Sequence, residues 1–183
     1  MPTGYGNTIN AMKIIEKLNT STFIVVPTLD LTYQWKEQLE KEFSMKIGEF
    51  SSRQKELLPI TVSTYQSAYI HAENLGNKFK LLIFDEVHHL PSESFRHIAE
   101  MFASPFRLGL TATYERADGL HGVLPKLVGG KIYEIEPASL AGTFLADYEI
   151  KKIMVSFTEQ EQQEYKAARG IFTNYLISHH IKM

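Results

Sequence analysis

Short apolar runs alternate with helix-like stretches along the first two thirds of the chain. The apolar runs have the length of buried strands, and they are residues 23–26, 60–63, 81–84 and 107–110. The stretches outside these runs repeat apolar residues every three or four positions, as one face of a helix does, and they are residues 9–18, 31–43, 65–75 and 95–102. Uniformly apolar strands that alternate with helices predict an α/β fold, a parallel sheet with helices on both faces.

The pattern changes towards the C-terminus. Tyr133 and Ile135 predict a strand, and alternating apolar positions within residues 148–157 predict a second, half-exposed strand. Thr158, with Glu161 three residues later, is typical of a capping box that opens a long helix, here to about His180. We therefore expect two parts, a lobe over residues 1–145 and a strand-and-helix extension or connector over residues 146–183.

The predicted helix over residues 9–18 follows almost directly after Met1, with no strand before it. A parallel α/β sheet usually feeds its first helix from a strand. We therefore expect the lobe to be truncated at its N-terminal side.

Composition excludes several functional classes. The 183 residues include no cysteine, which excludes a disulfide framework, a thiolate zinc site, an iron–sulfur cluster and a cysteine nucleophile. The formal net charge of −2 argues against a generally basic nucleic-acid-binding surface, although a local strip stays open. The apolar runs are too short to span a bilayer, and no signal peptide opens the chain. We expect a protein that is neither secreted nor in a membrane, located in the cytoplasm or nucleoid of a prokaryote or the nucleus of a eukaryote.

A glycine-rich segment opens the first predicted helix. Glycines let the backbone approach an anion, and a helix N-terminus offers free N–H groups. The candidate phosphate-binding residues are Thr3, Gly4, Tyr5, Gly6, Asn7 and Thr8. Thr8 stands where a P-loop hydroxyl coordinates magnesium, but Asn7 occupies the position of the P-loop lysine. A glycine-rich turn that only caps the helix is the alternative interpretation.

Asp85 and Glu86 directly follow the predicted strand over residues 81–84. Ligands of α/β sheets bind at the carboxyl ends of strands, so Asp85 is placed to hold Mg²⁺ and Glu86 to take a proton from water. An acidic pair at the start of a loop is the structural alternative. His88 and His89 follow, but adjacent residues do not share a helix face, which disfavours a zinc site there or at His179 and His180.

The ordered motifs resemble the first motor lobe of superfamily 2 helicases. They are Pro-Thr-Gly-Tyr-Gly (2–6), Val-Val-Pro-Thr (25–28), Ser-Thr-Tyr-Gln (63–66), Asp-Glu-Val-His-His (85–89) and Gly-Leu-Thr-Ala-Thr (109–113). The Asp-Glu-Val-His-His box is similar to that of DNA repair helicases of the xeroderma pigmentosum group B (XPB) type. The resemblance implies a RecA-like P-loop NTPase lobe that uses ATP and Mg²⁺, with DNA, a second helicase lobe and repair or transcription proteins as partners.

The resemblance also implies roles for single residues. Asp85 and Glu86 would be catalytic, Thr8 and Asp85 would hold the metal, and His88, His89, Thr111 and Thr113 would couple nucleotide to nucleic acid. The nucleic-acid contacts implied by the family motifs are Pro27, Thr28, Gln34, Ser63, Thr64, Tyr65 and Arg116. Trp35 falls in the same motif as Gln34, but its spacing with Leu31 and Leu39 predicts a core position.

Asn7 changes the expected activity. A hydrogen bond to a charged group is worth about 1.5–3 kcal/mol, so loss of the lysine should weaken nucleotide binding by roughly ten- to a hundredfold. We predict weak or absent ATP hydrolysis, also because no second-lobe motif follows Asp118. The leading interpretation is the ATP-binding motor lobe of an XPB-like DNA helicase. The alternative is a non-catalytic helicase-like module that docks DNA or a partner protein, and a P-loop kinase or GTPase explains fewer motifs.

Overall fold

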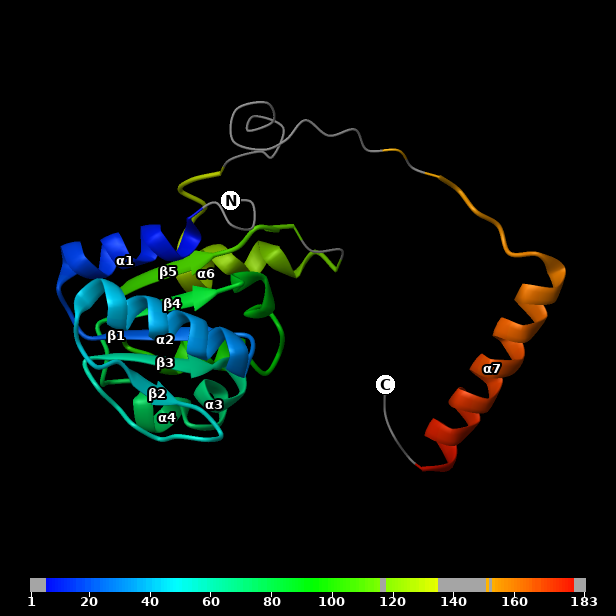
Figure 1. The fold of residues 1–183 in the computed structure, drawn as a ribbon, viewed down its shortest axis with the longest axis horizontal. Helices are drawn as coiled ribbons and strands as arrows, with labels where there is room; N and C mark the ends of the chain where they lie inside the picture. The colour runs from blue at the N-terminus through cyan, green and yellow to red at the C-terminus, as the bar shows by residue number, and fades with distance from the viewer. Residues whose placement is uncertain (1–5, 116–117, 135–150, 152, 180–183) are drawn as a thin grey trace. The chain divides into compact units, whose positions relative to one another are not determined.

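The computed structural model describes residues 6–115, 118–134, 151 and 153–179 (Figure 1). The chain divides into two units, residues 1–145 and residues 146–183. Each unit is described by itself below.

The first unit is built on a parallel sheet of five strands in the order β2-β3-β1-β4-β5. The strands are β1 (Thr22–Val26), β2 (Gly48–Phe50), β3 (Ile60–Thr64), β4 (Leu81–Asp85) and β5 (Phe106–Leu110). The register places Val25 of β1 beside Ser63 of β3 and Phe84 of β4. The four predicted strands and the parallel sheet are confirmed. β2 was not predicted, because its three residues are too short to show a pattern and include the charged, buried Glu49.

Helices fill the connections between the strands. They are α1 (Asn7–Leu18), α2 (Leu29–Phe43), α3 (Tyr65–Ile70), α4 (Ala72–Leu75), α5 (Arg96–Met101) and α6 (Leu124–Val128), with short 3₁₀ turns at Val87–His89 and Leu120–Val123. The single helix predicted over residues 65–75 is wrong in one respect. The backbone leaves helical geometry at His71, where φ is −115°, so two short helices replace one.

Strand alternation divides the core between the two faces of the sheet. Phe23 and Val25 of β1 pack on the face covered by α3 to α6, while Ile24 and Val26 pack on the opposite face with α1 and α2. All of these side chains are fully buried. This sandwich explains why the strands read as continuous apolar runs, because both of their faces lie against helices.

The second unit contains α7 (Glu159–Ser178), and its predicted N-terminus is confirmed. The Thr158 side chain accepts from the Glu161 amide, and the Glu161 side chain accepts from the Thr158 amide, which completes the capping box. The predicted strand is wrong for residues 151 and 153–157, which pair with no strand and leave Ile153, Val155 and Phe157 exposed. Tyr133 is likewise outside any strand, and Ile135, residues 148–150 and 152, and His180 lie outside the described residues.

Among the described residues, no helix combines the length and apolar character that a membrane crossing requires.

Candidate functional site

Asp85 is the last residue of β4, and two donors hold its carboxylate. The indole Nε1 of Trp35 donates to Oδ2 at 2.8 Å, and the backbone N–H of Glu86 donates to Oδ1 at 3.1 Å. Strand alternation places Asp85 on the same face as Leu81 and Ile83, the face that α1 and α2 cover. Burial raises the pKa of Asp85 above its ordinary value, partly opposed by the Trp35 hydrogen bond, while the Glu86 charge adds to the rise.

Glu86 turns the chain out of the strand in a left-handed conformation, with φ 50° and ψ 54°. Such a conformation costs about 1–3 kcal/mol in a residue other than glycine and is concentrated at functional sites. The turn places Glu86 Oε2 3.2 Å from the Thr111 hydroxyl and 3.2 Å from His88 Nδ1. The Thr111 hydroxyl also lies 3.0 Å from His88 Nδ1, so the three side chains form one cluster. The family resemblance implied that the Thr111 hydroxyl senses the Asp85–Glu86 pair, and the pairing of β4 with β5 brings these residues within hydrogen-bonding distance.

Two further residues predicted to couple nucleotide to nucleic acid lie beside this cluster. The Thr113 amide donates to the Thr111 hydroxyl at 3.0 Å, which ties the turn after β5 together. The His89 ring lies 4.2 Å from that of His88, between ring centroids, and is exposed to solvent. Among the described residues, no three His, Asp or Glu side chains gather closely enough to form a metal-binding group.

The N-terminus of α1 lies at the same edge of the sheet. The C-terminal end of α1 leads through a short loop into β1, so α1 runs antiparallel to the strands and starts where they end (Figure 1). Gly6 precedes the helix with φ 87°, a conformation that favours glycine, and it offers no side chain to cap the first turn. Asn7 and Thr8 are the first two helical residues and are half-buried. Thr3, Gly4 and Tyr5 lie outside the described residues.

Three of the predicted nucleic-acid contacts are accessible at this edge. Pro27 and Thr28 follow β1 directly, and the exposed Thr28 caps α2 by accepting from the Leu31 amide at 3.3 Å. Gln34 is exposed on the second turn of α2. Hydroxyl and amide groups at a helix N-terminus can hydrogen-bond to the phosphates of a nucleic acid whatever its base sequence. Arg116 lies outside the described residues.

Three other predicted contacts have buried side chains, and their role towards nucleic acid stays a prediction. The Ser63 hydroxyl donates to the Phe50 carbonyl at 2.6 Å, and Thr64 Oγ1 caps α3 by accepting from the Ser67 amide. Tyr65 is 2% exposed, and its hydroxyl donates to the Asp85 carbonyl at 3.0 Å. Burial raises the pKa of Tyr65 well above its ordinary value, and nearby Asp85 and Glu86 add to the rise. Of the three, Tyr65 supports the Asp85–Glu86 turn from the core side.

Sequence reasoning placed Trp35 only in part. Its predicted core position is confirmed, since it is 2% exposed. Its hydrogen bond to Asp85 was not foreseen, although a buried tryptophan needs an acceptor for its N–H and an aspartate was already assigned to the site.

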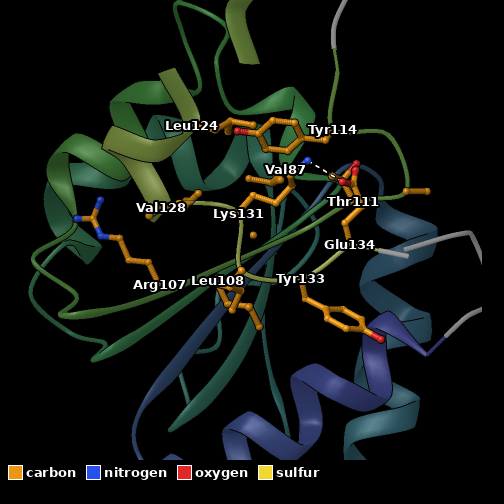
Figure 2. A pocket seen from close by; sticks show the side chains of 15 residues that line it. Val87, Arg107, Leu108, Thr111, Tyr114, Leu124, Val128, Lys131, Tyr133 and Glu134 are labelled. Carbon is orange, nitrogen blue, oxygen red and sulfur yellow. Dashed lines mark hydrogen bonds and ion pairs between the residues drawn. The ribbon is translucent and has the colours of Figure 1, made fainter. Parts of the chain in front are cut away.

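A separate pocket of about 320 Å³ lies beside β5. Figure 2 shows Tyr114, Leu124 and Val128 along one side of it and Leu108 and Tyr133 at the other end. Thr111 touches this pocket, but Asp85, Glu86 and the start of α1 do not line it. Among the described residues, the pocket is therefore separate from Asn7, Thr8, Asp85 and Glu86.

The parallel sheet with helices on both faces is the fold of a RecA-like ATPase lobe. The SWI2/SNF2 ATPase core of Sulfolobus solfataricus, solved in complex with double-stranded DNA, matches with a TM-score of 0.58 and 20% identity over 70% of this chain and 30% of that one. Residues 1–116 match the family described as type III restriction enzyme, res subunit, and the chain belongs to this family.

Two curated relatives extend the similarity over the C-terminal unit. The DNA 3'-5' translocase XPB2 of Sulfurisphaera tokodaii is 49% identical over 183 residues, all of this chain and 42% of the relative. The DNA 3'-5' helicase XPB of Mycobacterium tuberculosis is 36% identical over 180 residues, 92% of this chain and 33% of the relative. The resemblance to XPB-type helicases is thus confirmed, and the chain spans less than half the length of these relatives.

Proposed function

We propose that this chain is the ATP-binding first motor lobe of an XPB-type DNA helicase or translocase, in which ATP hydrolysis is coupled to movement on or opening of DNA. The observation that carries the proposal is the edge where β1, β4 and β5 end. The Asp85–Glu86 pair, the N-terminus of α1 and the Thr111 hydroxyl all lie at the carboxyl ends of these strands.

The residues at this edge fit Mg²⁺ and a nucleotide. Mg²⁺ prefers oxygen ligands and is usually held by one or two carboxylates, a hydroxyl and substrate phosphates. Asp85 supplies a fixed carboxylate and Thr8 a hydroxyl, while Gly6 and Asn7 begin a helix whose N–H groups favour phosphate. Thr3, Gly4 and Tyr5 belong to the same proposed loop. When bound, Mg²⁺ neutralises charge that develops on the phosphates.

Glu86 is the proposed base for the attacking water. Its contacts with Thr111 and His88 both use Oε2, so within the described residues Oε1 is the oxygen that remains for a water proton. His88, Thr111 and Thr113 would sense the state of this carboxylate, because they connect it to the turn after β5, and His89 would act through its ring contact with His88. Asp85 and Glu86 thus take separate roles, one holding the metal and the other moving a proton.

DNA is the proposed substrate of the longer protein. Pro27, Thr28 and Gln34 would contact its backbone at the start of α2, and Arg116 is a further proposed contact. A second helicase lobe would complete the ATP site, and repair or transcription proteins remain predicted partners.

Asn7 is expected to limit the activity of this lobe. The neutral amide replaces a point charge on the phosphates, and charge stabilisation supplies most of the catalysis of phosphoryl transfer. We expect weak nucleotide binding and weak or absent hydrolysis from the chain as it stands.

The test is a calorimetric titration of Mg-ATP into the chain, into Asn7→Lys and into Asn77→Lys. Asn77 is exposed in the turn between α4 and the start of β4, away from the carboxyl ends of the strands, so Asn77→Lys is the matched control for added positive charge. We expect Asn7→Lys to bind roughly ten- to a hundredfold more tightly than the unmodified chain, and Asn77→Lys to change little. Equal affinity in all three would contradict the phosphate loop and would favour a non-catalytic module that docks DNA or a partner protein.

A further inference from the structure

The single tryptophan of this chain, Trp35, lies in the interface between α2 and β4. Trp35 is 2% exposed, and it packs in the core cluster that includes Leu39, Ile24 and Ile83. Its indole N–H reaches across to the Asp85 carboxylate, 50 residues later in the chain, at 2.8 Å. One side chain therefore joins the helix that follows β1 to the carboxylate at the end of β4.

Packing alone does not require a tryptophan at this position. A leucine or phenylalanine would also fill apolar space between α2 and the sheet, as Leu39 does one turn farther along. The indole differs from these side chains by one N–H donor, which must find an acceptor when it is buried. Here the acceptor is a carboxylate, and a bond to an ionised acceptor is shorter and stronger than one to a neutral group.

The bond fixes the orientation of Asp85. Oδ2 accepts from the indole and Oδ1 from the Glu86 amide, so donors on two different elements prevent rotation of the carboxylate. Each oxygen keeps a second lone pair for another partner. Outer partners of this kind orient metal ligands, and their loss typically lowers metal affinity by about 10–100-fold.

We propose that Trp35 is a positioning residue for the metal ligand Asp85, which it holds ready for Mg²⁺ at the carboxyl edge of the sheet. The proposal rests on the proposed function, since it takes Asp85 as the ligand. It adds a residue of α2 to the metal site, and it gives that residue a role beyond the core position its spacing predicts.

Mn²⁺ alone is the probe, because it replaces Mg²⁺ at oxygen sites and its binding is measured by the relaxation of water protons. The titration uses the full chain, Trp35→Phe, Asp85→Asn and Ser104→Ala. The last is the matched control, because the Ser104 hydroxyl also makes one buried hydrogen bond, to the Phe79 carbonyl at 2.7 Å, at the opposite edge of the sheet. Circular dichroism verifies that each variant is folded.

We expect Trp35→Phe to weaken Mn²⁺ binding by about 10–100-fold, Ser104→Ala to leave it unchanged, and Asp85→Asn to abolish it. Loss in Asp85→Asn with unchanged affinity in Trp35→Phe would overturn the role of Trp35 and leave the metal site standing. Unchanged affinity in Asp85→Asn would instead overturn the metal assignment of the proposed function, and the role of Trp35 with it.

A second replacement keeps the test valid if Trp35→Phe does not fold. Because Trp35 is the only tryptophan, biosynthetic incorporation of β-(3-benzothienyl)alanine changes this position alone. The analogue keeps the two-ring shape and carries sulfur in place of the N–H. Mn²⁺ affinity equal to that of the unmodified chain would overturn the proposal, and a loss similar to that expected for Trp35→Phe would support it.

Discussion

Gly109 of β5 lies directly against the side chain of Val87 in the turn that follows Glu86. A Cβ atom at Gly109 would come within 2.9 Å of Val87 Cγ2 and 3.1 Å of both Cβ and Cγ1. The missing side chain therefore lets the turn approach β5 closely. This approach is what brings Thr111, two residues after Gly109, within hydrogen-bonding distance of Glu86.

Gly109→Ala is expected to destabilise the lobe by about 1–3 kcal/mol, the usual cost of overpacking a closely packed site. Val87 is 3% exposed and branched at Cβ, so it has little room to move away. Urea denaturation measures the loss. Gly122→Ala is the control, because a Cβ there would meet nothing within 4 Å, and its free energy of unfolding should stay within about 0.5 kcal/mol of the original. Equal stability of the two variants would contradict close packing at Gly109.

Asp85→Asn is expected to stabilise the lobe at neutral pH when metal is removed with EDTA. Burial raises the pKa of Asp85 in the folded state, so folding favours the protonated form. The protonated carboxyl therefore contributes stability at low pH, and this contribution is lost as the pH rises through the folded-state pKa. Asparagine removes the charge and keeps one oxygen acceptor, for Trp35, but its NH₂ group then faces the Glu86 amide and that hydrogen bond is lost. A lost hydrogen bond costs about 0.5–1.5 kcal/mol, so we expect a net gain of at most about 1 kcal/mol at pH 7.

Thermal unfolding of both proteins at several pH values measures this effect. The gain should shrink as the pH falls towards the ordinary range of a carboxyl group, where Asp85 is protonated in both the folded and the unfolded state. A gain that stays constant with pH would show that charge is not its cause.

Arg107→Ala is expected to cost about 2–3 kcal/mol, because hydrogen bonds from a charged donor are among the strongest in proteins. The guanidinium donates to the carbonyls of Phe102, Ser104 and Leu127 at 2.6, 3.3 and 2.7 Å, which ties α6 to the start of β5. Chemical denaturation measures the loss. Arg169→Ala in α7 should cost little, since the hydrogen bond from Arg169 to the Tyr165 hydroxyl is exposed. A similar cost for both arginines would argue against the role of Arg107 in holding α6.

Thr158→Ala is expected to reduce the helix content of α7, with a cost of about 0.5–2 kcal/mol for the lost cap. Thr173→Ala, inside the same helix, should not reduce it. Circular dichroism and amide exchange of the first turn of α7 measure the effect. Hydrogen bonds from the Thr158 amide and hydroxyl lower the pKa of Glu161, so the contribution of the cap should be lost as the pH falls through that pKa. First-turn exchange that is the same in both variants would count against the capping box.

The sequence predicted the sheet well, because its strands are buried on both faces and read as unbroken apolar runs. Strand β2 escaped prediction because its three residues include Gly48 and Glu49, which only tertiary contacts bury. The strand predicted near Tyr148–Phe157 rested on alternation alone. Alternation shows which residues could share a face, but it does not supply a neighbouring strand to pair with.

For the candidate site, order along the chain placed Asp85 and Glu86 correctly at the carboxyl edge of the sheet. The Ser-Thr-Tyr-Gln motif (63–66) did not predict that the side chains of Ser63 and Tyr65 are buried. β3 lies between β2 and β1 and continues directly into α3, so these side chains point into the core. The bond between Trp35 and Asp85 was also beyond prediction, because it depends on how α2 packs over β4 and not on local spacing.

Among the described residues, β5 is an edge strand of the sheet and pairs with β4 along one side. Phe106, at the start of this strand, is 45% exposed. Strand borders offer backbone donors and acceptors as a template for another chain. Concentrated preparations of the isolated lobe should therefore tend to join copies by extending the sheet. A lysine in place of Phe106 is the natural change for keeping such samples dispersed during crystallisation or NMR.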